Sequence, residues 1–221
     1  MTAAPLPASL FHAAPLHRLP CIIQDGALFP QSVLAGRHLS PRPTAARRDR
    51  MLGLADYVHL SLSSRTPLLA HKMAKGYPHA VLVFDRAAVL ALPGVALLPF
   101  NTKAWRDKAS FAPVTDPEAQ ASLLRDHAER GRCPSLEALV PYGLGLDILT
   151  RLVFFNDSEC ESLRAVLEAA SLRPPAPLCA APWLFPGGAG YAPTTLPAHL
   201  AYFAACCEAR SVLPPPEIVF D

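Results

Sequence analysis

Short runs of hydrophobic residues, either continuous or alternating with polar ones, predict several strands along the chain. Successive side chains of a strand point to opposite faces, so such runs are typical of a sheet with one or both faces buried. In LEALV, for example, Leu136, Ala138 and Val140 share one apolar face, and Glu137 and Leu139 share the other. The predicted strands are SLFHA (9–13), YVHLSL (57–62), HAVLVF (79–84), LEALV (136–140) and RLVFF (151–155).

Capping residues indicate where helices begin and end. Thr66 followed by Pro67 is typical of an N-cap and a first helical residue, and Gly76 is suited to end that helix. Asp116 with Pro117 predicts a second helix that ends near Gly131, Asp157 opens a third, and a fourth is expected from about Thr195 to Arg210.

Helices and strands do not alternate regularly, which disfavours a doubly wound parallel sheet. We therefore expect an α+β fold with a mixed, largely antiparallel sheet and flanking helices. The chain has 221 residues, of which 51% are hydrophobic, enough for one substantial core. We assign residues 1–185 to one domain, and 186–221 to a C-terminal helix and a proline-rich extension packed on the same domain.

Composition narrows the possible classes of protein. The six cysteines form no CxxC pair, so metal binding is not expected. The N-terminal residues do not have the pattern of a signal peptide, and the longest apolar run, 87–100, is too short to span a bilayer, so we expect a cytoplasmic protein without membrane contact. A formal net charge of +2 permits nucleic-acid binding without indicating it.

The common nucleotide-binding and hydrolase motifs are missing, so candidate chemistry depends on single residues. Glu137 is a carboxylate within a predicted strand; it either faces water at a sheet edge or serves a function. His12 lies in the first predicted strand, where a structural role is the ordinary interpretation. The run RPTAARRDR (42–50) holds four arginines. It is interpreted as a solvated loop, with folding over a pyrophosphate as the alternative.

The order of these features resembles the DarT-type ADP-ribosyltransferases, bacterial toxins that modify single-stranded DNA. The resemblance lies in SLFHAAPLHRLPCIIQDGALFP, the arginine-rich run, ADYV (55–58), SSRTPLLA (63–70) and LEALVPYGLGLDILTRLVFFND, and covers roughly residues 10–185. It implies an ADP-ribosyltransferase-like domain that uses NAD+ as its substrate and needs no metal.

The resemblance also implies roles for individual residues. Glu137 matches the catalytic glutamate, which stabilises positive charge on the ribose as the bond to nicotinamide breaks. Arg48 matches an arginine that binds NAD+ and takes part in catalysis. His12, Ala13 and Ala14 match the segment that binds the nicotinamide end of NAD+. Phe29, shortly after Gly26, matches a position that lines the same pocket.

The chain also departs from the family pattern. Ala14 stands where the family often has threonine, the aromatic residues common after Asp-Tyr-Val are replaced by HLSL, and the usually basic loop before the glutamate reads GRCPSLE. That loop contacts the target, so RNA or protein is an alternative to DNA, and a non-catalytic NAD+-binding module is a third possibility. The resemblance further implies a macrodomain-type antitoxin as a partner.

Overall fold

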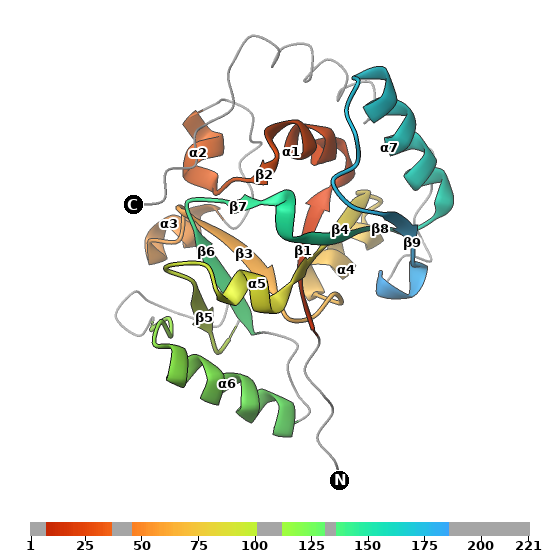
Figure 1. Cartoon of the computed structure of the whole chain (residues 1–221). Helices are drawn as coiled ribbons and strands as arrows, with labels where there is room; N and C mark the ends of the chain where they lie inside the picture. The colour runs from red at the N-terminus through yellow and green to blue at the C-terminus, as the bar shows by residue number, and fades with distance from the viewer. Residues whose placement is uncertain (1–7, 37–45, 101–111, 131–135, 186–221) are drawn as a thin grey trace.

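The computed structural model describes residues 8–36, 46–100, 112–130 and 136–185. A seven-stranded sheet with the order β5-β6-β3-β1-β4-β8-β9 forms the centre of the molecule (Figure 1). All neighbouring strands are antiparallel except β8 and β9, which are parallel, so the predicted mixed and largely antiparallel sheet is confirmed. The strands are β1 Ser9–Pro15, β3 Tyr57–Ser61, β4 His79–Asp85, β5 Ala96–Leu98, β6 Glu137–Pro141, β8 Leu149–Phe154 and β9 Leu178–Ala180.

A second, two-stranded ladder joins β2 (Ala27–Leu28) to β7 (Leu144–Gly145). It lies beside α1 (Leu19–Asp25), in the upper part of Figure 1. The helix ends at Gly26, whose φ of 68° is the left-handed conformation that glycine adopts without steric cost. The strand that carries His12 is thus followed by a short helix that ends at glycine.

The main hydrophobic core lies on one face of the large sheet. Leu10, Leu60, Leu82 and Ala138 point into it, one from each of four neighbouring strands. Within the described residues, three helices contribute buried side chains to the same core. They are α1, α5 (Arg86–Leu90) and α7 (Asp157–Ala169).

The opposite face of the sheet carries two smaller apolar clusters. One contains Val81 and Val83 of β4 beneath α4 (Pro67–Ala74), and the other contains Leu98 of β5 and Leu139 of β6 beneath the segment that follows α3 (Ala46–Leu52). Helix α6 (Pro117–Arg130) lies beyond β5 at one end of the molecule (Figure 1). Short helical segments complete the described part: η1 Leu16–Arg18, α2 Gln31–Gly36, η3 Leu146–Ile148 and η4 Pro182–Leu184.

Two of the predicted helix starts are confirmed and one is displaced by a residue. The Thr66 side chain accepts a hydrogen bond from the Leu69 amide at 3.1 Å, and Asp116 accepts one from the Ala119 amide at 2.8 Å. The third helix is capped by Asn156 instead of Asp157, because Asn156 Oδ1 accepts from the Glu159 amide at 2.9 Å. Glu159 Oε2 in turn accepts from the Phe155 amide at 3.0 Å, which completes a reciprocal cap.

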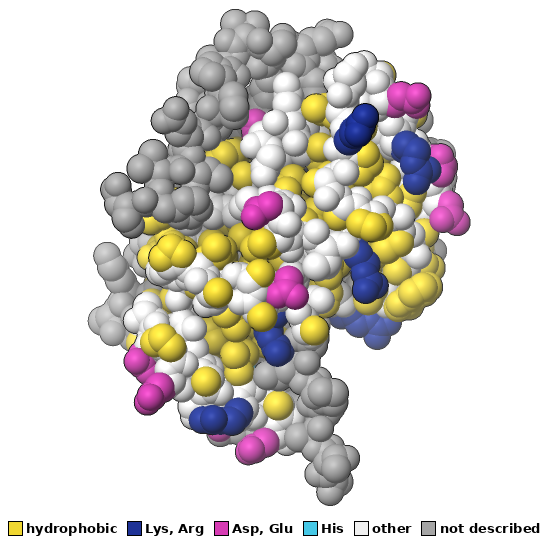
Figure 2. Space-filling model, in the orientation of Figure 1, with side chains coloured by type: hydrophobic (Ala, Val, Ile, Leu, Met, Phe, Trp, Pro, Cys, Tyr) yellow, Lys and Arg dark blue, Asp and Glu magenta, His cyan; other side chains and the backbone are white. Residues whose placement is uncertain are grey.

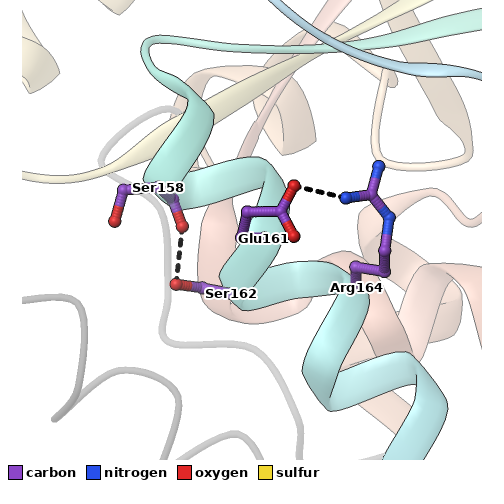
Figure 3. A network of polar contacts seen from close by, with 4 residues as sticks. All are labelled: Ser158, Glu161, Ser162 and Arg164. Carbon is purple, nitrogen blue, oxygen red and sulfur yellow. Dashed lines mark hydrogen bonds and ion pairs between the residues drawn. The ribbon is translucent and has the colours of Figure 1, made fainter.

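The exposed side of α7 carries local polar contacts (Figure 3). Ser162 Oγ donates to the Ser158 carbonyl at 2.7 Å, and Arg164 forms an ion pair with Glu161 one turn away. Such pairs on a helix surface are worth little to stability. These residues are therefore suitable positions for control substitutions.

The arginine-rich run differs from its prediction. Residues 46–52 form helix α3, whereas the sequence pattern favoured a loop. The helix is held by the apolar residues that follow the arginines, since Leu52 and Leu54 are buried in the cluster with Leu98 and Leu139. The predicted helix from about Thr195 to Arg210 and the whole extension 186–221 lie outside the described residues, so the domain boundary at 185 stays a prediction.

Within the described ranges, no helix is both long and apolar enough to cross a membrane. Figure 2 shows basic side chains scattered among acidic ones on one face of the molecule, without a broad basic patch on the part of that face that is described. On the described part of this face, as in the whole sequence, basic and acidic side chains nearly balance each other.

The buried His79 is expected to make the stability of the fold dependent on pH. Its Nδ1 lies 2.8 Å from the Tyr77 carbonyl and therefore donates to it. Burial, together with the nearby Lys72 and His12, lowers the pKa of His79 from 6.5 to about 4, against the opposing effect of this hydrogen bond. Between these values the unfolded chain binds a proton that the native protein excludes. The free energy of unfolding is therefore expected to fall as the pH falls from about 6.5 to about 4.

We expect this loss to approach, at most, about 1.4 kcal/mol per pH unit. Urea unfolding at pH 7 and pH 5 measures it, and His79→Gln is expected to make the difference between the two pH values smaller. His71→Gln is the control, because His71 is exposed on α4. Equal pH dependence in the native protein and the His79 variant would contradict the assignment.

Candidate active site

Glu137 lies inside the sheet and not at its edge. Strand β6 pairs with β5 on one side and with β3 on the other, and Glu137 is opposite Leu98 and Ser61 in the two ladders. Its side chain is 12% exposed. The interpretation of Glu137 as a solvated residue of an edge strand is therefore wrong. The predicted alternation is confirmed, because Leu136, Ala138 and Val140 point into the main core.

Strand register places one row of side chains across the sheet at the level of Glu137. Ser61 of β3 is opposite Glu137, Phe11 of β1 is opposite Ser61, and Val83 of β4 is opposite Phe11. Directly opposed residues of an antiparallel pair share a face of the sheet. Glu137 therefore projects to the face that carries the two smaller apolar clusters, between them.

His59 is an ionisable neighbour of Glu137. It is opposite Leu139 in the ladder, which makes it a diagonal neighbour of Glu137 on the same face. Its Nδ1 lies 3.6 Å from Glu137 Oε2. The His59 side chain is 27% exposed, so the pair is shielded from water without being sealed from it.

His12 joins this group through the backbone. Strands β1 and β3 form a ladder pair at Phe11 and Ser61, whereas β1 and β4 pair along seven residues, so β3 diverges from β1 beyond that point. In the diverging part His12 Nδ1 lies 2.9 Å from the His59 carbonyl. Side chains alternate along β1, so His12 lies on the face of the sheet opposite to Phe11. His12 therefore does not share a face with Glu137. It is linked to Glu137 indirectly, through its contact with the carbonyl of His59.

The environment of His12 sets its protonation. A carbonyl oxygen only accepts, so Nδ1 must carry the proton that it donates to His59. Burial lowers the pKa of His12, its hydrogen bond to the His59 carbonyl opposes that effect, and the nearby imidazole of His59 adds to it. The neutral ring with a proton on Nδ1 leaves Nε2 as a hydrogen-bond acceptor.

Helix α3 brings further charge toward the site. Asp49 is 7% exposed, and its negative charge acts on His59. Its carbonyl accepts from the Leu54 amide at 2.7 Å, which fixes the turn after the helix. The backbone of Arg48 lies in α3, directly before Asp49; the side chain of Arg48 lies outside the described residues.

The loop between β3 and α4 is fixed by a chain of hydrogen bonds that begins at Ser61. Ser61 Oγ accepts from the Ser63 amide at 3.1 Å, and Ser63 Oγ accepts from the Arg65 amide at 3.2 Å. Arg65 donates from Nε and Nη2 to the Trp183 carbonyl, at 3.1 and 2.7 Å. The SSRTP segment thus follows the residue opposite Glu137 and is attached to η4, far along the chain.

The remaining predicted site residues lie in two places. Ala13 and Ala14 follow His12 in β1 and are opposite Val81 and Ala80 of β4. Phe29 follows β2, in the two-stranded ladder, and is partly buried. Among the described residues, no cluster of three His, Cys, Asp or Glu side chains is arranged to hold a metal ion.

Sequence reasoning did not single out His59 and Asp49 as site residues. The alternation Tyr57, His59, Ser61 places a histidine on the face of β3 that pairs with the face of Glu137, but only the register of β3 against β6 brings the two together. One sequence signal pointed to His59: the segment HLSL stands where the family commonly has aromatic residues.

The fold is similar to solved structures of DarT. The structure of Thermus sp. 2.9 DarT in complex with NAD+ has 18% sequence identity and a TM-score of 0.59, and the match covers 82% of this chain and 98% of that one. For the same protein in complex with ADP-ribosylated single-stranded DNA the identity is 16% and the TM-score 0.62, over 83% and 98% of the two chains. These matches show that the chain has the DarT-type fold.

A second organism provides a similar structure. Thermosipho africanus DarTG in complex with ADP-ribose has 13% identity and a TM-score of 0.61, and the match covers 80% of this chain and 50% of that chain. No protein-family model matches the sequence, and a search of curated proteins finds no match.

Proposed function

We propose that the protein transfers ADP-ribose from NAD+ to a base of single-stranded DNA. The observation that carries the proposal is Glu137, a shielded carboxylate on a central strand beside His59, in a fold whose solved examples hold NAD+ and ADP-ribosylated single-stranded DNA. The ordered sequence features that resemble the DarT-type enzymes support the same function.

In the proposed reaction the bond between C1′ of the ribose and the nicotinamide nitrogen breaks, and nicotinamide leaves with the bonding electrons. The ribose then carries positive charge. Glu137 stabilises that charge and binds a ribose hydroxyl, and a ring or exocyclic nitrogen of the base attacks C1′. The proton lost from the base passes to Glu137 or to water. A rigid strand suits this task, because it keeps the carboxylate oriented toward the ribose as the positive charge develops.

The other residues bind NAD+ in this proposal. His12 offers Nε2 as an acceptor to the nicotinamide end, and the backbone of Ala13 and Ala14 continues the contact. Phe29 lines the pocket. Arg48 orients NAD+ with its guanidinium, which always remains charged. Ala14 lacks the hydroxyl that the family often has at its position, so only its backbone can serve here.

An unpaired base is the expected acceptor, since the Watson–Crick edge must be reached. The segment GRCPSLE before Glu137 differs from the usual basic loop and favours RNA or protein as the second candidate target. We propose a cytoplasmic toxin whose modification a macrodomain-type antitoxin removes. Survival of cells that express the protein only when such a partner is co-expressed would support this pairing.

A competition experiment tests the target. Labelled NAD+ is supplied with single-stranded DNA oligonucleotides, RNA of the same sequences and lysate protein, and the label in each is measured. The proposal expects label on DNA, about 10²–10⁴-fold less label with Glu137→Gln, and a product mass increased by one ADP-ribose group. Label on RNA or protein would show that the target is not DNA, while the proposed transfer of ADP-ribose from NAD+ would still hold. Binding of NAD+ without release of nicotinamide would identify a non-catalytic module.

Arg48→Ala is expected to lower transfer by about 10²–10³-fold, because it removes a fixed charge from the reacting NAD+. Nicotinamide release and labelled DNA are measured in parallel. Arg125→Ala is the matched control, since Arg125 is exposed on α6, and we expect it to retain the native rate. Equal rates for both variants would exclude Arg48 from the machinery.

A further inference from the structure

His59 connects two residues of the proposed active site. Its carbonyl accepts the hydrogen bond of His12 at 2.9 Å, and its imidazole Nδ1 lies 3.6 Å from Glu137 Oε2. One residue of β3 is thus in contact with both the strand that bears the NAD+-binding histidine and the strand that bears the carboxylate. A change at His59 is therefore expected to affect the proposed reaction, although the His59 side chain is not expected to touch the reacting atoms.

The surroundings of His59 favour a polar and ionisable role over simple packing. On its face of the sheet, one apolar cluster contains Phe11 and the other contains Tyr57 and Leu139. His59, Ser61 and Glu137 lie between the clusters. An apolar side chain at 59 would join the two clusters, so the imidazole interrupts a surface that is otherwise suited to hydrophobic packing.

Among the described residues, the charged and titratable groups that act on His59 come from three elements. Glu137 lies on β6, Asp49 on α3 and His12 on β1. Burial opposes the charge on His59. The hydrogen bond and the charge of Glu137, followed by the charge of Asp49 and the Leu54 carbonyl, outweigh burial, so the pKa of His59 is raised above 6.5.

We propose that His59 is a positioning residue for Glu137 and a proton-controlled brake on the reaction: its imidazole positions the carboxylate through the close contact of Nδ1 with Oε2, and its protonated form slows the cleavage of NAD+. This inference rests on the function proposed above. A negative charge beside the ribose cation stabilises the transition state of the proposed reaction. An imidazolium 3.6 Å from the carboxylate neutralises part of that charge, whereas the neutral ring keeps the polar contact without adding a positive charge.

The first test measures the pair without any enzyme activity. The His59 imidazole is titrated by NMR in the native protein, in Glu137→Gln and in Asp49→Asn. Loss of either carboxylate is expected to lower the pKa of His59, with the larger change for Glu137→Gln. The same pKa in the native protein and in Glu137→Gln would overturn the proposal, whether or not the protein is an ADP-ribosyltransferase.

The second test measures the pH dependence of nicotinamide release, as kcat/KM, from about pH 6 to about pH 9. The native rate is expected to rise with pH, by up to about tenfold per pH unit below the pKa of His59. In His59→Gln the amide keeps a hydrogen-bond donor but has no titration in this range. Its rate is expected to lie within about threefold of the native plateau and to stay flat.

His59→Phe removes both the donor and the charge. It is expected to lose about tenfold or more at every pH, because the carboxylate is no longer aimed. His71→Gln on exposed α4 is the control and should keep the native profile. If kcat/KM of His59→Gln still rises with pH as in the native protein, the proposal is overturned. Absence of nicotinamide release by the native protein would instead refute the proposed function. The NMR titration would then decide by itself whether Glu137 and His59 interact.

Discussion

Glu137→Gln is expected to reduce nicotinamide release and DNA labelling by about 10²–10⁴-fold. Glutamine has nearly the same shape but no charge, so the variant keeps the contacts of the side chain within the sheet and loses the stabilisation of the ribose cation that we propose for Glu137. Because Glu137 is opposite Ser61 and Leu98 in two ladders, its backbone position does not depend on the charge. The loss should therefore appear in kcat with little change in thermal stability.

The matched control is Glu161→Gln on the exposed side of α7 (Figure 3). Glu161 is 69% exposed and pairs with Arg164 on the same helix. The same chemical substitution there is expected to leave both the rate and the melting temperature almost unchanged. A Glu137→Gln enzyme that retains more than about a tenth of the native rate would contradict the catalytic assignment.

Phe84→Ala is expected to lower the free energy of unfolding by about 3–5 kcal/mol. Phe84 is fully buried in the main core, opposite Leu10 of β1 and Leu149 of β8. The ladder register shifts between Val83 and Phe84, where Thr150 Oγ1 donates to the Val83 carbonyl at 2.9 Å. Neighbouring side chains in such a packed site relax only partly into the space, so the cavity adds to the lost burial.

Urea unfolding followed by circular dichroism measures this loss. Leu68→Ala is the control, since Leu68 is 50% exposed on α4, and a change of about 0.5 kcal/mol or less is expected there. A loss below about 1 kcal/mol for Phe84→Ala would show that the centre of the sheet is less tightly packed than its burial indicates.

The sequence pattern located the long strands and their faces because those features are local. All five predicted strands are present with boundaries within two residues, and the alternation at Leu136, Ala138 and Val140 is confirmed. The strands that were not predicted have only two or three residues, too few for a pattern of alternation to appear. Their pairing partners stabilise them, and local sequence does not identify those partners.

Helix α3 illustrates the opposite case. Its arginines have no helical periodicity, so the sequence predicts a loop for the run 42–50, but burial of Leu52 and Leu54 against Leu98 holds the helix over residues 46–52 in place. Tertiary contacts outweigh weak local preference here. The shift of the α7 cap from Asp157 to Asn156 is smaller: both residues are good caps, and the backbone conformation selects one.

The sequence by itself determined the α+β class, the strand that carries Glu137, the apolar face beside it and the ordered resemblance to the DarT-type enzymes. Only the tertiary structure decided that β6 is a central strand, that Glu137 is shielded, and that His59 lies against it while its carbonyl accepts from His12. The physical reason is register. Side-chain alternation is set by neighbouring residues, whereas the alignment of β3 with β6 is set by packing between segments far apart in the chain.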